Sequence, residues 1–465
     1  MSEPLALVPL AMAARDGRVD EHAARELVAA GITLLQRCPP LVRALSGKRA
    51  GILLPTSPAF VTALAASDGR GTVLINPLAA PAEVAYQIAD AGIGAVFTIG
   101  ALVKKLPAGT PHVLLDDAPA RARLAIAGET RDVDLGSHTG IALEGELDAP
   151  GRDEESVIVY TSAMAGTPLG AILTHRNILA NARATIEAME LNEDTVALAL
   201  LPFAHLFGFT VTLVAPMLTG ARSVTLGRFN PVKALELIRS EGVTLLVGVP
   251  SVFHAILAAL DRGGSALGRT SLRLCVCGGA PLAVELQERW ERVTGLPLRQ
   301  GYGLTEGSPV CLVNRPSAPN RRGTLGTAFP GVNVAVHDGE IVVRGENVFR
   351  GYVSGGEHGL AVRDGWLHTG DAGSIDMEGY VTFARVIKPM FTRNGFNIYP
   401  REIERVVGDM PGVKRVTASA ITEPARENDV ALDLVGAVRE EDVQRWCEER
   451  LSTYKRPSRI TIHDR

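Results

Sequence analysis

Short apolar runs alternate with amphipathic stretches from about Glu21 to Gly100 and again from Ser156 to Gln300, whereas Pro107–Arg152 is acidic with little period and predicts peripheral strands and loops. The runs Ala50–Pro55 and Gly71–Asn76 have the length and composition of buried strands, and Pro81–Ala91 has the spacing of a helix. The same alternation predicts strands at Val157–Tyr160, Val243–Val249, Ser271–Cys277 and Leu298–Gln300, and helices at Thr174–Met189, Pro231–Glu241, Val252–Leu260 and Leu282–Val293. Strands that alternate with helices predict an α/β fold with doubly wound βα subdomains, in which parallel sheet is covered by helices.

Two helix starts can be predicted from single residues. Asn230 followed by Pro231 is typical of an N-cap and a first helical position, so a helix is expected to begin at Pro231. Ser251 is expected to cap a helix that begins at Val252.

Beyond Arg315 the pattern changes to short strands separated by turns. The segments Val332–His337, Gly339–Arg344 and Tyr380–Ala384 predict a small antiparallel or β-barrel-like subdomain. After Arg385 the pattern predicts an α+β unit with a helix from Pro400, strands at Val413–Ile421 and Asp429–Val435, and a helix at Glu440–Leu451. A chain of 465 residues is too long for one core. We therefore expect a large N-terminal domain (1–385) and a small C-terminal lid domain (386–465), with a hinge at Lys388.

Composition narrows the function classes. A hydrophobic content of 46% and a formal charge of −4 argue against a disordered or nucleic-acid-binding protein. The five cysteines include no C-x-x-C pair and no metal-ligand spacing, which favours a cytoplasmic location, and the N-terminus lacks the basic region of a signal peptide. The uncharged stretch between Asp194 and Arg222 could span a bilayer, but the prolines and His205 within it favour a buried strand, loop and helix.

The stretch Gln300–Pro309 (QGYGLTEGSP) combines three kinds of ligand-binding group. Tyr302 offers a flat ring, Thr305 a hydroxyl for an anion, and Glu306 a carboxylate for a divalent metal. Together they indicate a nucleoside triphosphate with Mg²⁺. The alternative is a glycine-rich turn that carries an incidental acid.

Three further stretches carry candidate chemistry. In Ser156–Gly170 (SVIVYTSAMAGTPLG) a strand leads into a loop of hydroxyl and small residues, either a phosphate loop or an ordinary turn. His205 stands among apolar residues, as a core histidine or as the wall of an apolar substrate pocket. Asp371, between Gly370 and Ala372, is suited to a ribose diol or to stabilising a turn.

These stretches occur together in a known order. YTSAMAGTPLG, LPFAHLFGF, GYGLTEGSP, GEIVVRGENVFRGY, GWLHTGDAG and NGFNIYPREIE closely resemble the ordered motifs of the adenylate-forming (ANL) superfamily, from about Ser156 to Lys455. That superfamily comprises acyl- and aryl-CoA synthetases, peptide-synthetase adenylation domains and firefly luciferases. The pair GYGLTE and RGENVFRGY looks most like the acyl-CoA synthetase branch of AMP-binding enzymes.

The resemblance implies ATP-dependent activation of a hydrophobic carboxylic acid as an acyl-adenylate. Rotation of the small domain and transfer to coenzyme A, or to a carrier protein, would follow, in a monomer or homodimer without a membrane span. It assigns catalysis to Thr305, Glu306 and His205, with Glu306 holding Mg²⁺. It also assigns ATP/AMP binding to Thr161, Ser162, Gly166, Gly170, Gly279, Ala280, Tyr302, Gly303, Asp371 and Arg385, and the acyl pocket to His205, Phe207, Gly279, Pro309 and Val310.

The sequence departs from the family pattern at three places. Leu169 stands where the phosphate loop usually has a lysine, and Val386 stands where an arginine usually leads into the hinge, with Arg385 one place early. No lysine follows Lys455, although the family's small domain usually ends with one. The departures raise a rival expectation, a catalytically impaired homologue that binds acyl-adenylate or acyl-CoA without full turnover.

Overall fold

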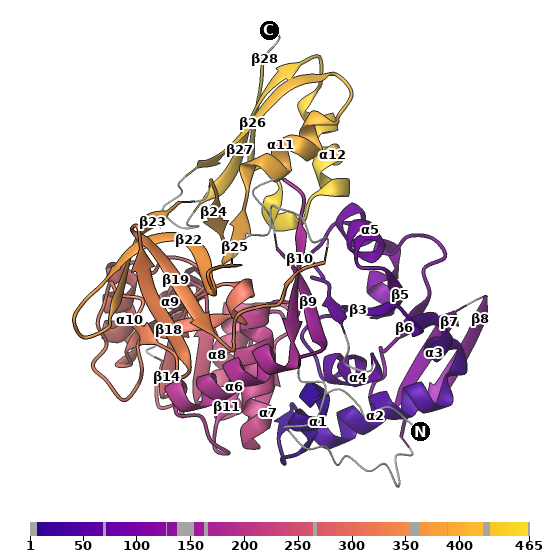
Figure 1. Cartoon of the computed structure of the whole chain (residues 1–465), viewed down its shortest axis with the longest axis horizontal. Coiled ribbons are helices and arrows are strands. Elements are labelled where there is room, and N and C mark those ends of the chain that lie inside the picture. Colours follow the sequence, from indigo (N-terminus) through magenta and orange to yellow (C-terminus); the bar gives the residue numbers. More distant parts are fainter. Residues whose placement is uncertain are drawn as a thin grey trace.

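A computed structural model describes residues 7–67, 71–126, 128–136, 153–161, 166–263, 267–353, 362–387, 389–421 and 428–463 of the chain. Two nine-stranded sheets form the body of the molecule, and the C-terminal segment stands above them (Figure 1). The buried apolar residues of the two sheets and their helices form one large continuous core with a smaller satellite.

The first sheet contains the strands predicted near the N-terminus and those that flank the expected phosphate loop. Its order is β20 (Gly351–Tyr352), β10 (Leu169–Thr174), β9 (Glu155–Thr161), β4 (Thr72–Leu74), β3 (Arg49–Leu53), β5 (Ile93–Thr98), β6 (His112–Leu114), β7 (Arg121–Ile126) and β8 (Glu129–Asp134). The strands from β9 to β6 run parallel, and antiparallel strands complete both edges. The α/β prediction is confirmed.

The second sheet carries the later βα units. Its order is β17 (Thr327–Ala328), β16 (Val310–Val313), β15 (Leu298–Gly303), β14 (Leu274–Cys277), β13 (Leu245–Gly248), β11 (Val196–Ala199), β12 (Arg222–Thr225), β1 (Arg18–Val19) and β2 (His22–Ala23). The neighbours β13, β14 and β15 are parallel, so their carboxyl ends meet at one edge of the sheet, where ligands bind in folds of this type.

Helices cover both sheets. They are α1 (Leu7–Ala13), α2 (Ala24–Arg37), α3 (Pro39–Leu45), α4 (Ala59–Ala66), α5 (Pro81–Asp90), η1 (Gly100–Lys105), α6 (His175–Met189), η2 (Phe207–Val214), α7 (Ala215–Thr219), α8 (Pro231–Ser240), α9 (Pro250–Gly263) and α10 (Val284–Thr294). Helices α2 and α4 approach closely at Gly31, where a Cβ atom would lie 2.4 Å from the Thr62 carbonyl oxygen.

One of the two predicted helix starts is confirmed. The Asn230 side chain accepts from the N–H groups of Val232 and Lys233, which caps α8 as expected. The prediction for Ser251 was wrong, because α9 already begins at Pro250 and Ser251 lies in its first turn. A proline with its fixed φ is favoured at the first position of a helix.

The uncharged stretch between Asp194 and Arg222 is a buried strand (β11), a turn, the π-helical segment η2 and the short helix α7, as predicted. None of the helices among the described residues is long and apolar enough to cross a membrane.

A third, antiparallel sheet follows the second one. It consists of β18 (Val332–His337), β19 (Glu340–Gly345), β22 (Trp366–Ile375), β21 (Val362–Arg363) and β23 (Val381–Val386), in agreement with the predicted antiparallel subdomain.

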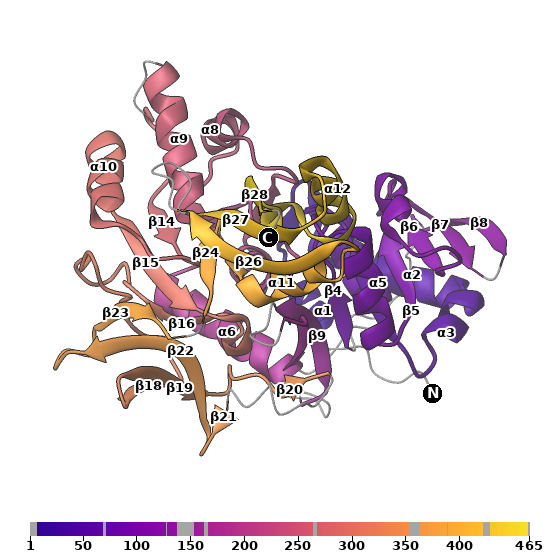
Figure 2. The ribbon, with the colours of Figure 1, turned by 90° about the horizontal axis from the view of Figure 1, so that it is seen from above.

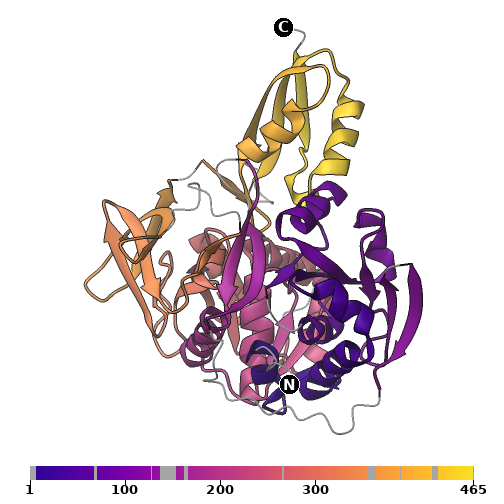
Figure 3. The same ribbon diagram turned by 45° about the vertical axis from the view of Figure 1, so that its right-hand side comes forward.

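The segment after β23 is an α+β unit with its own core around Ile398, Ile403 and Leu432. Its elements are β24 (Phe391–Arg393), β25 (Phe396–Ile398), α11 (Pro400–Gly408), β26 (Val413–Ile421), β27 (Asp429–Gly436), α12 (Glu440–Arg450), η5 (Thr453–Lys455) and β28 (Arg459–His463). The helix predicted at Pro400 begins there. Viewed from above, this C-terminal unit lies over the middle of the molecule (Figure 2), and a turned view shows α12 standing above α5 (Figure 3).

Candidate functional site

The candidate site forms where β15 ends and the chain turns back into β16. After Gly303 the chain makes the short 3₁₀ turn η3 (Thr305–Gly307) and returns along β15 as an antiparallel neighbour. The turn after the parallel neighbour β14, Gly278–Ala280, lies beside it, and both turns line one cavity. Gly279 has φ +77°, a conformation that glycine adopts without strain.

Two buried asparagines hold the β15–β16 turn. Asn181, fully buried on α6, donates to the carbonyls of Gly307 (3.3 Å) and Val310 (2.7 Å). The Asn347 side chain also donates to the Gly307 carbonyl (2.9 Å), and the backbone carbonyl of Asn347 accepts from the Ser308 hydroxyl (2.6 Å). These bonds satisfy backbone groups that would be costly to leave unpaired in a buried turn. The position of the turn is therefore fixed from two sides.

Tyr302 and Asp371 meet at the expected nucleotide site. The Tyr302 hydroxyl donates to Asp371 Oδ2 at 2.7 Å. Burial and the neighbouring carboxylate raise the pKa of Tyr302 well above its usual value, so the hydroxyl keeps its proton and remains a donor. Both residues line a cavity of about 130 Å³ that is also lined by Gly279, Ala280, Gly303, Thr305 and Glu306.

Glu306 is held by a second tyrosine. The Tyr352 hydroxyl, from β20 of the first sheet, donates to Glu306 Oε1 at 2.7 Å. Burial and the charge of Glu306 raise the pKa of Tyr352, which therefore stays protonated. No group of three or more His, Cys, Asp or Glu side chains suited to a metal ion occurs among the described residues. A lone carboxylate still fits Mg²⁺, which binds proteins through one or two carboxylates and takes its other ligands from water and phosphates.

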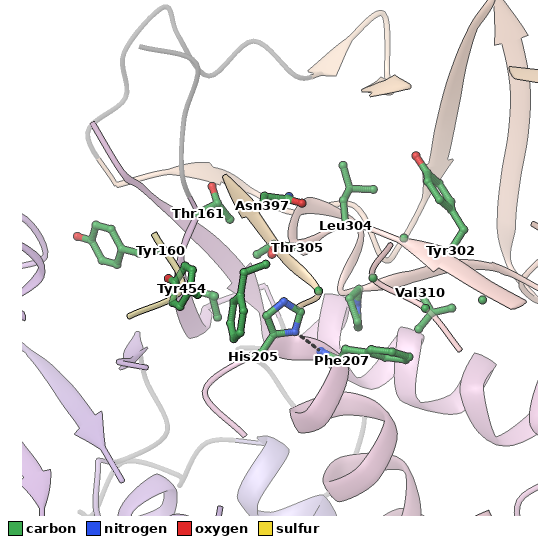
Figure 4. Close-up of a pocket in the computed structure, with 18 residues that line it drawn as sticks. Tyr160, Thr161, His205, Phe207, Tyr302, Leu304, Thr305, Val310, Asn397 and Tyr454 are labelled. Carbon is green, nitrogen blue, oxygen red and sulfur yellow. Dashed lines mark hydrogen bonds between the residues drawn. The ribbon is translucent and has the colours of Figure 1, made fainter. Parts of the chain in front are cut away.

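His205 lies at the centre of the pocket shown in Figure 4. Its Nδ1 accepts from the N–H group of Phe207 at 3.2 Å, so in the neutral ring the proton is on Nε2. Burial lowers the pKa of His205 to about 4, and the imidazole is uncharged near neutral pH. The pocket measures about 120 Å³ and is also lined by Phe207, Pro309 and Val310.

A larger apolar cavity of about 460 Å³ opens on the other side of His205. Its walls include Leu201, Phe229 and Val249, which follow β11, β12 and β13 of the second sheet, and Phe396 from the C-terminal unit. His205, Phe207 and Gly279 line both this cavity and the smaller pocket, so the two hollows adjoin.

The expected phosphate loop is described in part. Thr161 ends β9 and lies opposite Leu169 in the β9–β10 ladder, and Gly170 is buried in β10. The Gly166 carbonyl accepts from Arg405 Nε of α11 at 2.9 Å. Ser162 lies outside the described residues, as does the expected hinge residue Lys388.

Arg385 lies apart from the other expected nucleotide residues. It is exposed on β23, opposite Ala372, whereas the next residue, Val386, pairs with Asp371 and lines the cavity. Successive side chains of a strand point to opposite faces. Arg385 and Val386 therefore point to opposite faces of β23, and Val386 is on the face that lines the cavity.

Several lining residues were not singled out in the sequence. They are Phe396, Asn397, Tyr399 and Tyr454, and Tyr352, which bonds to Glu306, was not singled out either. Tyr352 stands in GEIVVRGENVFRGY, and Phe396, Asn397 and Tyr399 stand in NGFNIYPREIE, so the motifs contained the signal but did not state which side chains face the site. Tyr454 lies in none of these motifs.

Comparisons with known proteins agree with this geometry. Residues 43–353 match the family described as AMP-binding enzyme. The chain is 29% identical to a long-chain-fatty-acid–CoA ligase of Bacillus subtilis, covering 88% of this chain and 81% of that protein. It is 32% identical to a feruloyl-CoA synthase of an Amycolatopsis species, over 90% of this chain and 85% of that protein.

A solved structure shares the whole architecture. A malonyl-CoA ligase in a ternary product complex with methylmalonyl-CoA and AMP superposes with a TM-score of 0.79 at 25% identity, covering 98% of this chain and 97% of that chain. With the family match over residues 43–353, these likenesses show that the chain belongs to the AMP-binding enzyme family.

Proposed function

We propose that this protein activates a hydrophobic carboxylic acid with ATP and transfers the acyl group to coenzyme A. The observation that carries the proposal is the convergence of Tyr302, Thr305, Glu306 and Asp371 on one cavity that adjoins the apolar pocket at His205. Relatives that are named as CoA ligases and a CoA synthase support the same reaction.

In the first step a carboxylate oxygen of the acid attacks the α-phosphorus of ATP, and pyrophosphate leaves. Asp371 would accept from the ribose hydroxyls while Tyr302 fixes its carboxylate, and Thr305 would donate to a phosphate oxygen. Mg²⁺, held by Glu306, would supply charge neutralisation at the phosphates. Tyr352 would orient the Glu306 carboxylate.

In the second step the thiol sulfur attacks the acyl carbon, the bond from that carbon to the bridging anhydride oxygen breaks, and AMP leaves with this oxygen. The thiol proton goes to solvent or to AMP. The Nε2–H group of neutral His205 is not used by Phe207, whose N–H is bonded to Nδ1, and would donate to the acid's oxygen in the pocket. Phe207, Pro309 and Val310 would form the wall against the acyl group.

The acid is proposed to be apolar, because the 460 Å³ cavity beside His205 is lined mainly by aliphatic and aromatic side chains. A panel of aryl and fatty acids tests this with purified protein, ATP, Mg²⁺ and coenzyme A, following pyrophosphate release and acyl-CoA formation. We expect turnover with at least one apolar acid and none with acetate. The proposal fails if no acid of the panel yields pyrophosphate or thioester.

A second candidate function rests on Leu169. Its place opposite Thr161 puts an apolar side chain where the resemblance expects a lysine, so adenylation would be slow and the thioester step favoured. Synthetic acyl-adenylate, supplied with coenzyme A, separates the two steps. Acyl-CoA formed from the adenylate but not from acid and ATP would favour this candidate.

We also propose that the chain divides at 385/386 into a large N-terminal domain and a small C-terminal lid domain, with a hinge at Lys388.

A further inference from the structure

A buried cluster of charges joins α5 to the C-terminal unit. Lys455 Nζ lies 2.8 Å from Glu83 Oε1 and 2.6 Å from Glu402 Oε1. The exposed fractions of the three side chains are 5%, 10% and 3%, so the cluster is almost dry. Ser452 adds a hydrogen bond from its hydroxyl to the other oxygen of Glu83. Glu402 belongs to the same unit as Lys455, whereas Glu83 comes from α5.

The lysine of this cluster is charged. Burial by itself lowers the pKa of Lys455, but the adjacent Tyr454 and the carboxylates of Glu402 and Glu83 outweigh burial and raise it. A buried ammonium needs close carboxylates, since an unpaired buried charge is strongly unfavourable. Lys455 therefore depends on Glu83 whenever the C-terminal unit rests on α5.

Other features of this interface surround the cluster. A cavity of about 350 Å³ is lined by residues of α5, α11 and α12, and Glu83 and Lys455 are among its lining residues. The Arg405–Gly166 hydrogen bond is a second link between the two parts of the molecule. An interface hollowed in this way relies on a small number of polar links rather than on continuous apolar packing.

A chain of aromatic contacts leads from the cluster to the site. Tyr454, next to Lys455, stacks on Phe396 with ring centroids 4.1 Å apart and planes 12° apart. Phe396 in turn meets the His205 ring edge-on at 6.3 Å. Phe396 and Tyr454 line the same pocket as His205 and Thr305 (Figure 4 labels Tyr454, His205 and Thr305). A displacement of Lys455 would therefore be felt at His205.

We propose that Glu83 is a positioning residue: its ion pair with Lys455 seats the C-terminal unit on α5, and this holds the Phe396–Tyr454 stack against His205. The effect on acyl transfer rests on the proposed function, whereas the seating of the C-terminal unit does not. Loss of the pair frees the unit from α5 and removes one wall of the pocket.

Glu83→Gln tests this inference without disturbing α5. Glu83 Oε2 also accepts from the Ala80 N–H at 2.8 Å, and glutamine serves equally well at that capping position. Hydrogen exchange of the full chain should report the seating at β25 and η5. We expect exchange there to rise by about tenfold or more, because one partner of a buried ion pair has lost its charge.

Glu236→Gln is the matched control, since Glu236 pairs with Lys233 on the exposed face of α8. It should leave exchange at β25 and η5 as in the unchanged protein. With synthetic acyl-adenylate and coenzyme A, Glu83→Gln should slow thioester formation by about tenfold, whereas Glu236→Gln should change it by less than about twofold. Wild-type exchange in Glu83→Gln overturns the inference. Faster exchange with an unchanged thioester rate shows seating without positioning, and also overturns it. If the protein shows no acyl transfer at all, the proposed function is refuted. The hydrogen-exchange comparison between Glu83→Gln and Glu236→Gln still tests whether Glu83 seats the C-terminal unit.

Discussion

The asparagine clamp on the β15–β16 turn leads to a quantitative prediction. Asn181→Ala removes two donated bonds, to the Gly307 and Val310 carbonyls, and one accepted from the Val310 N–H at 3.4 Å. Gly307 keeps its bond from Asn347, but the groups of Val310 lose their side-chain partner. With about 1 kcal/mol for each bond and a small cavity, the free energy of unfolding should fall by about 3 kcal/mol.

The assay is urea unfolding followed by tryptophan fluorescence, with Thr185→Ala as the control. Thr185 is equally buried on α6, but its hydroxyl donates to the backbone carbonyl of Asn181 in its own helix, so a loss of about 1 kcal/mol is expected. A loosened turn should also misplace Glu306. We therefore expect Asn181→Ala to lower kcat/KM for ATP by about tenfold and the control to lower it less than about twofold.

The reasoning is refuted if Asn181→Ala and Thr185→Ala have equal unfolding energies and equal kinetics. That result would mean that the turn keeps its geometry without the clamp.

Four further predictions concern the site. The pKa of His205 is about 4 in the folded protein instead of its ordinary 6.5, so the folded state binds fewer protons than the unfolded state between these pH values. The free energy of unfolding should therefore fall as the pH drops from 6.5 to 4. In urea unfolding across that range, His205→Gln should lack this part of the pH dependence. Leu169→Lys should strengthen ATP binding by about tenfold in calorimetry if the position faces the phosphates, because a charge-assisted contact is added, and Leu169→Met should not. Glu306→Gln should raise the Mg²⁺ concentration needed for half-maximal pyrophosphate release by at least about tenfold, and an unchanged requirement would remove Glu306 from the metal site. Tyr302→Phe removes the hydroxyl that donates to Asp371 Oδ2 at 2.7 Å, and should raise KM for ATP by about tenfold with little change in KM for the acid; equal effects on both would argue against a nucleotide role.

The sequence determined the elements of this protein because their signals are local. Apolar periodicity located β3, β4, β9, β13, β14 and β15 but not all of the strands between them, and the Asn230 side chain capped α8 as its type and position predicted. The error at Ser251 arose where two local signals competed, and the fixed backbone of Pro250 set the start of α9 two residues before the predicted Val252. The motif order also predicted that these stretches gather in one place, and residues of several of them line one cavity.

Tertiary structure decided which side chains share the site. Tyr302 bonds to Asp371 across 69 positions, Glu306 to Tyr352 across 46, and Lys455 to Glu83 across 372. Arg385, which was expected at the nucleotide, does not line the cavity, because strand pairing put its neighbour Val386 opposite Asp371 on the cavity face. Such pairs depend on how sheets and the C-terminal unit pack against each other, and that packing is set by the summed burial of residues far apart in the chain rather than by any short stretch.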